Sequence, residues 1–145
     1  MQTADLNTIE TMENWEGMRA AFPTSSNTGT AATATAYMTF EPGAELPEHR
    51  DSAEEVVVVL EGAVEGSIDG ERGILTVGQL AVIPAMAPHG FRNIGDVAAR
   101  VLGFFGGSTN VATFTDEHGP DAWRVFVVGG PTPLTAPLDR EPALV

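Results

Sequence analysis

The feature of this 145-residue sequence that most constrains its fold is a succession of short apolar runs separated by turn residues, from Ala31 to Val128. The runs recur roughly every ten residues without an intervening helical segment. Between two of them, the pair Asp69-Gly70 is a strong hairpin signal. The pattern predicts an all-β sandwich or small barrel, with strands near residues 37–41, 56–60, 64–69, 73–76, 81–84, 89–93, 100–105, 111–114 and 124–128.

The two ends of the chain differ from this central region. Residues 129–145 are rich in Pro and predict an extended C-terminal tail. Residues 24–30 are small and polar and predict a connector. Before the connector, apolar side chains at about helical spacing predict a short N-terminal helix that Pro23 ends; they are Ile9, Met12, Trp15, Met18 and Phe22. We therefore expect one domain over residues 1–145, with the helix and connector in residues 1–30 and the barrel in residues 31–128.

Composition excludes several classes of function. The chain has 20 acidic and seven basic residues, all Arg, and a formal net charge of −13, which disfavours binding to nucleic acids and to anionic membranes. It contains no Lys and no Cys, so Schiff-base chemistry, disulfides and thiolate metal sites are excluded. Apolar runs are too short for a membrane-spanning helix. We expect a soluble protein located in the cytoplasm.

Candidate chemistry centres on two segments that contain two of the chain's three His residues. His49 and Asp51 are two residues apart, so on a strand both side chains point to the same face. Glu55 follows as the chain enters an apolar strand, and His89 belongs to a separate strand. If the sheet curls into a barrel, these four N and O donors can converge. Such a set suits a divalent first-row transition metal.

The spacing of these residues resembles the two sequence motifs of the cupin superfamily. The first motif is matched by Gly43, His49, Glu55 and Gly62. The second is matched, after 15 intervening residues from Gly62, by the set Gly78, Pro84, His89 and Asn93. The resemblance covers roughly residues 35–115 and implies a double-stranded β-helix, or jelly-roll barrel, with a metal held inside. It also implies a small-molecule substrate and a homodimer.

Two positions depart from the motifs: Asp51 occupies the place of a second His, and Met86 the place of a Gly. We expect Met86 to alter a turn or to add an apolar wall to the pocket. With Asp51, the ligand set of His49, Asp51, Glu55 and His89 favours Fe(II) or Mn(II), with Zn(II) or Ni(II) as further options.

The role of the two carboxylates stays open at the level of sequence. Two His and one carboxylate can form a facial triad, which leaves either Asp51 or Glu55 as a catalytic general base. Alternatively, Asp51 marks the loss of the metal, and His49 and His89 are buried polar residues with hydrogen-bond partners. His118 lies in a turn-like sequence and is expected on a surface loop.

The resemblance implies a metal-dependent small-molecule enzyme, and the possible facial triad favours dioxygenase-like chemistry on an oxygen-chelating organic substrate. Two alternatives follow from the same residues. One is a non-oxidative, metal-dependent isomerase, lyase or cyclase. The other is a non-catalytic cupin that binds a small ligand.

Overall fold

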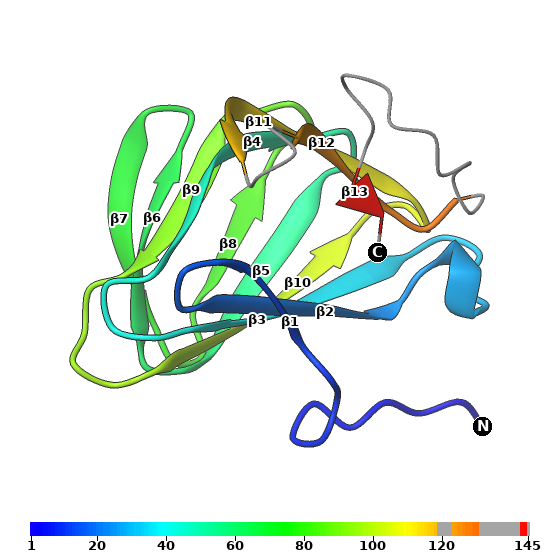
Figure 1. Cartoon of the computed structure of the whole chain (residues 1–145), viewed down its shortest axis with the longest axis horizontal. Coiled ribbons are helices and arrows are strands. Elements are labelled where there is room, and N and C mark those ends of the chain that lie inside the picture. The colour runs from blue at the N-terminus through cyan, green and yellow to red at the C-terminus, as the bar shows by residue number, and fades with distance from the viewer. Residues whose placement is uncertain (119–122, 131–142, 145) are drawn as a thin grey trace.

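A computed structural model describes residues 1–118, 123–130 and 143–144. In this part of the chain two sheets, both antiparallel except for one short parallel pairing, curve around a common interior (Figure 1). The six-stranded sheet has the order β1-β2-β3-β10-β5-β8, and the seven-stranded sheet the order β13-β12-β11-β4-β9-β6-β7. The strands are β1 (Met12–Trp15), β2 (Met18–Thr24), β3 (Ala34–Phe40), β4 (Glu45–Asp51), β5 (Glu55–Glu61), β6 (Ala63–Ile68), β7 (Glu71–Thr76), β8 (Leu80–Ile83), β9 (His89–Asn93), β10 (Ala99–Phe105), β11 (Asn110–His118), β12 (Trp123–Val128) and β13 (Ala143–Leu144).

This arrangement is the predicted all-β jelly roll, and each predicted strand overlaps an observed one. The expected hairpin joins β6 to β7, where Asp69 and Gly70 both have positive φ angles, of 49° and 82°. Such angles at both central residues are typical of the tight turn that matches the twist of paired strands. Alternate side chains of the strands point between the sheets and form the core, as Val57 and Val59 do in β5.

The predicted N-terminal helix is wrong. Residues 12–24 form the antiparallel β1–β2 hairpin, and β2 pairs along its length with β3. Gly17, with φ of +73°, makes the turn, which few other residues tolerate. Met18 and Ala20 alternate into the core, so the apolar stripe is buried by a sheet edge and not by a helix face. The helix in the described residues is the short 3-10 turn η1 (Ser26–Thr28).

The predicted extended tail falls largely outside the described residues, except for the short strand β13, which pairs with β12.

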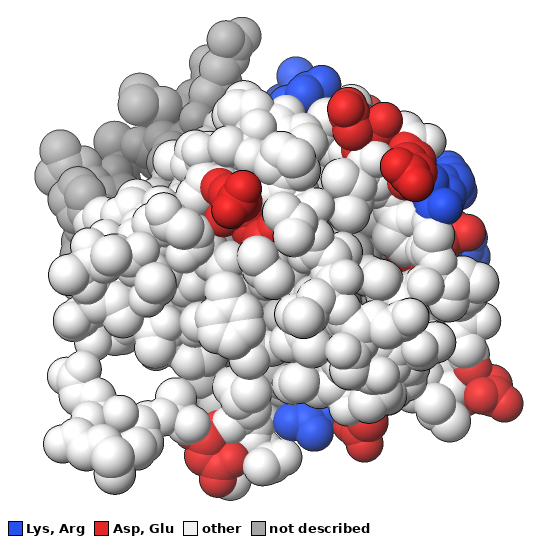
Figure 2. Space-filling view, turned by 180° about the vertical axis from the view of Figure 1, so that it is seen from behind, with Lys and Arg blue, Asp and Glu red and all other residues white. Residues whose placement is uncertain are grey.

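Within the described part of the chain, no helix has the length and apolar character needed to cross a bilayer. Seen from behind, the molecule presents a broad surface with few charged side chains (Figure 2).

Candidate metal centre

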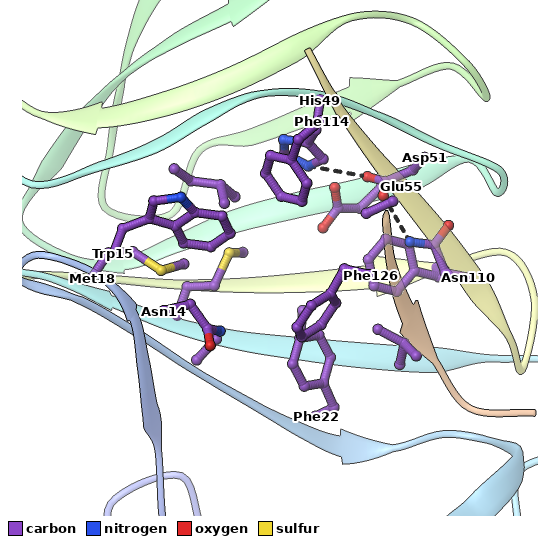
Figure 3. Close-up of a pocket in the computed structure, with 17 residues that line it drawn as sticks. Asn14, Trp15, Met18, Phe22, His49, Asp51, Glu55, Asn110, Phe114 and Phe126 are labelled. Carbon is purple, nitrogen blue, oxygen red and sulfur yellow. Dashed lines mark hydrogen bonds and ion pairs between the residues drawn. The ribbon is translucent and has the colours of Figure 1, made fainter. Parts of the chain in front are cut away.

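Strands from both sheets bring the predicted donor residues together inside the barrel. His49 and Asp51 project from β4, Glu55 from the start of β5 and His89 from the start of β9. Asp51 Oδ2 lies 3.1 Å from His89 Nε2 and 3.5 Å from His49 Nε2. Glu55 Oε2 lies 3.5 Å from His89 Nε2. All four side chains are buried, and Figure 3 shows His49, Asp51 and Glu55 facing one another.

Backbone carbonyls fix the orientation of both imidazole rings. His49 Nδ1 donates a hydrogen bond to the carbonyl of Pro47 at 2.8 Å, and His89 Nδ1 donates to that of Ala87 at 2.9 Å. Because a carbonyl oxygen only accepts, each Nδ1 carries a proton, and Nε2 is the ring nitrogen that faces the centre of the cluster. This is the arrangement found in metal-binding His residues.

Asn110, at the start of β11, holds the carboxylate of Asp51. Its Nδ2 donates to Asp51 Oδ1 at 2.7 Å, while its own Oδ1 accepts hydrogen bonds from the amide of Ala53 and the hydroxyl of Ser52. Asn110 is 1% exposed and Asp51 is also buried, so the hydrogen bond between them is shielded from water. The network leaves Asp51 Oδ2 directed at the two Nε2 atoms. The motif analysis did not identify Asn110.

The electrostatics of the cluster favour positive charge at its centre. Burial by itself raises the pKa of Asp51, but the contacts with His49 and His89 outweigh it and hold this pKa well below its usual range. Burial likewise works to lower the pKa of His89, yet the nearby carboxylates of Asp51 and Glu55 raise it to about 10. Burial, assisted by the charge of Asp51, raises the pKa of Glu55.

A divalent metal ion fits these residues. Asp51 Oδ2 and His89 Nε2 are buried and make no hydrogen bond within the described part of the chain, which is costly unless another group satisfies them. One donor atom from each of His49, Asp51 and His89 lies within 4.8 Å of the others. Two imidazoles and a carboxylate form a donor set that binds first-row transition metals. Glu55 borders this three-residue group, which we call the His-Asp-His cluster.

An apolar cavity opens from the His-Asp-His cluster (Figure 3). Phe114 stacks on His49 with ring centroids 4.8 Å apart, and Trp15 packs against Phe114 at 4.9 Å. Phe22 and Phe126 form a second aromatic pair, 5.4 Å apart. Thus β1 and β2, whose conformation the sequence analysis predicted wrongly, supply part of the cavity wall. Its lining also includes Asn14, Met18, Met38, Leu46, Glu55 and Asn110.

Met86 keeps the turn that the second motif forms with Gly. It adopts a φ of +65°, its amide donates to the carbonyl of Asp51 at 2.8 Å, and its carbonyl accepts from Arg50 at 2.7 Å. Its side chain is 53% exposed and lies outside the cavity lining, so the expected apolar wall is not formed by this residue. The side chain of His118 lies outside the described residues.

Comparison with known proteins agrees with this fold. The family model of the cupin domain matches residues 36–105. Polyketide synthase CurC from Streptomyces cyaneus is 42% identical over 62 residues, which are 42% of this chain and 40% of that protein. The match therefore spans less than half the length of this curated relative.

Two solved structures are similar in fold. A sugar phosphate isomerase of the cupin superfamily from Silicibacter pomeroyi has a TM-score of 0.65 and 24% identity, covering 79% of this chain and 82% of that one. The polyketide cyclase RemF from Streptomyces resistomycificus has a TM-score of 0.63 and 18% identity, covering 72% and 78%. Together, the family match and the shared jelly roll show that this chain contains a cupin domain, matched over residues 36–105.

Proposed function

We propose that this protein is a metal-dependent enzyme that cyclises an apolar, oxygen-rich aromatic substrate of the polyketide type without consuming oxygen. One observation carries the proposal. The His-Asp-His cluster, with two unsatisfied buried donor atoms, lies at the wall of a cavity lined mainly by aromatic and aliphatic side chains.

His49, Asp51 and His89 would hold the ion through Nε2, Oδ2 and Nε2. When bound, a divalent cation would polarise a ketone or enol oxygen of the substrate and make the adjacent carbon acid stronger. The two backbone carbonyls that orient the rings, and Asn110 behind Asp51, hold these donor atoms in place before any ligand arrives. Asp51 would bind the ion through Oδ2 and accepts the Asn110 hydrogen bond through Oδ1, so it is not the group that carries protons in the reaction.

Glu55 is the carboxylate placed to move a proton. It lines the cavity beside the His-Asp-His cluster and is absent from the group whose donor atoms all lie within 4.8 Å. A base in this position can accept a proton from a substrate carbon and return it to a leaving hydroxyl group. The cyclisation then forms one bond within the substrate and releases water, with no change in oxidation state.

The aromatic wall selects the substrate class. Trp15, Phe22 and Phe126 offer flat apolar surfaces that suit fused or conjugated rings. The large negative charge of the chain disfavours a strongly anionic substrate such as a phosphate ester. The names of the relatives CurC and RemF, a polyketide synthase and a polyketide cyclase, support the same choice.

Dioxygenase-like chemistry is the second candidate. Two His and one carboxylate form the donor set of many non-haem Fe(II) oxygenases, and the His-Asp-His cluster has this composition. Oxygen uptake separates the two candidates, because a cyclase forms the same product under nitrogen.

The test uses metal-loaded protein and an aromatic β-diketone with an ortho hydroxyl group, which can cyclise with loss of water. Protein reconstituted separately with Zn(II), Mn(II) and Fe(II) is incubated with and without oxygen, and products are identified by mass spectrometry. We expect a product lighter by one water in the absence of oxygen, and its formation to be abolished in His89→Ala and strongly slowed in Glu55→Gln. A product that requires oxygen and gains oxygen atoms would contradict the cyclase proposal and support the second candidate.

A further inference from the structure

We infer that Gly103 is a positioning residue: by lacking a side chain, it fixes where the carboxylate of Glu55 lies beside the His-Asp-His cluster. The functional consequence rests on the proposed function, because that proposal makes Glu55 the residue that accepts and returns the proton. The geometry itself stands independently.

Gly103 lies in the middle of β10, where an inward-facing side chain would normally pack. It pairs with Ala36 of β3 on one side and with Val57 of β5 on the other. Its neighbours in the same orientation, Val101 and Phe105, are both buried core residues. Glycine in the interior of a strand is unfavourable and often marks a close approach of another group.

The group that approaches Gly103 is the Glu55 side chain. A Cβ atom at position 103 would lie 2.1 Å from Glu55 Oε1 and 3.2 Å from Glu55 Cδ. Because Glu55 pairs with Phe105 in the same strand β10, its side chain reaches diagonally across the sheet to occupy the space above Gly103. The carboxylate therefore fills the volume that any other residue at position 103 would need.

The clash is with the end of a flexible side chain and not with backbone atoms. Alanine at position 103 can therefore be accommodated by movement of the carboxylate, without a shift of the strands. Glu55 lines the cavity, so its carboxylate can swing away from β10 toward the His-Asp-His cluster. Its Oε2 already lies 3.5 Å from His89 Nε2. Gly103→Ala is thus expected to change the position of the Glu55 carboxylate relative to the metal site.

Cobalt(II) is a suitable probe, because its visible absorption depends on the number and type of its ligands. We expect Gly103→Ala to shift the Co(II) absorption bands relative to the unmodified protein. Gly73→Ala is the matched control, since Gly73 lies in strand β7 with no atom within 4 Å of an added Cβ. This control should leave the spectrum unchanged. In a Glu55→Ala background, Gly103→Ala should produce no further shift, because the carboxylate that it displaces is gone.

An unchanged spectrum in Gly103→Ala, or an equal shift with and without Glu55, would overturn the inference. Thermal unfolding of the metal-free variants provides a separate readout. We expect Gly103→Ala to lower Tm when Glu55 is present and to have no such effect in the Glu55→Ala background. If the unmodified protein binds no Co(II), the proposed function fails, and the Tm comparison alone decides whether Gly103 positions Glu55.

Discussion

At the scale of single residues, the distinctive feature of the site is Asp51, which replaces an expected His and is held by Asn110. The Asn110 side chain donates to Asp51 Oδ1 at 2.7 Å and is itself fixed by the backbone of Ala53. A carboxylate can bind a metal through either oxygen. Because this hydrogen bond engages Oδ1, Oδ2 is the oxygen that remains for a metal. By orienting this carboxylate, Asn110 allows Asp51 to serve as a candidate metal ligand at the position where the motif has a His.

Replacing Asn110 with Ala is expected to weaken divalent metal binding by about tenfold to a hundredfold, because groups that orient metal ligands typically contribute this much. The affinity can be measured by competition with a chelator of known metal affinity. Asn27→Ala is a control for the loss of an amide, since Asn27 is exposed in η1. Unchanged metal affinity in Asn110→Ala would mean that the hydrogen bond from Asn110 does not orient Asp51 for metal binding.

Met86 carries backbone strain that glycine would relieve. A φ of +65° costs a residue with a Cβ roughly 1 kcal/mol or more, whereas glycine adopts it freely. Since half of the Met86 side chain is exposed, little packing is lost on its removal. We expect Met86→Gly to stabilise the fold by about 1 kcal/mol, measured by denaturant unfolding. Met86→Ala should give no such gain; an equal gain in both variants would place the strain elsewhere.

The sequence predicted that four candidate donor residues would lie together, because two share one face of a strand and all occupy spaced motif positions, and the structure brings these side chains together. It did not locate Asn110, which is 59 residues from Asp51 along the chain and belongs to no local pattern. Gly103 gave a weaker signal, as an isolated glycine within an apolar strand, but its partner Glu55 could be found only from the pairing of β10 with β5.

At the scale of elements, the β1–β2 hairpin links the fold to the chemistry. Its Trp15 ring packs on Phe114, which in turn stacks on His49, so a peripheral hairpin contributes to the wall beside the His-Asp-His cluster. The spacing of Ile9, Met12, Trp15 and Met18 fits a helix as well as a hairpin. Pairing with β3, a long-range interaction that local periodicity does not reveal, decides between them.

Trp15→Ala is expected to weaken the binding of an aromatic β-diketone at least about tenfold, since the flat surface that packs on the ligand is lost. Metal affinity should stay the same, because Trp15 is outside the set of candidate ligands. Titration calorimetry of the metal-loaded protein measures the first quantity and chelator competition the second. A parallel loss of both affinities would show that the hairpin supports the site and not the substrate.

At the scale of the whole molecule, the outer face of the six-stranded sheet is unusually apolar. Cross-strand pairing places Val82, Val56 and Phe104 in one row, and Leu80, Val58 and Leu102 in the next. Phe104 is 43% exposed, and Leu80 and Val82 more so. Val56 and Val58, on the outward-facing side of β5, are only half-buried by the described residues.

We predict that two copies of the chain associate through this face to form the expected homodimer. A chain with a net charge of −13 repels its copy, and the repulsion is weakest where side chains are uncharged. Sedimentation velocity should show a dimer that Phe104→Glu converts to a monomer. Ile74→Glu, an equivalent change at an exposed site on β7 of the other sheet, should leave it intact. A monomeric unmodified protein, or a dimer that survives Phe104→Glu, would contradict this prediction.

The measurement that tests the account most directly is the metal content of the protein purified without a histidine tag or chelator. We predict close to one equivalent of a first-row transition metal per chain, and its loss in the His49→Ala and His89→Ala variants when both are shown to be folded by circular dichroism. Elemental analysis by mass spectrometry gives both numbers. No transition metal in the unmodified protein, even after incubation with Fe(II), Mn(II) and Zn(II), would contradict the account, as would undiminished metal in both variants.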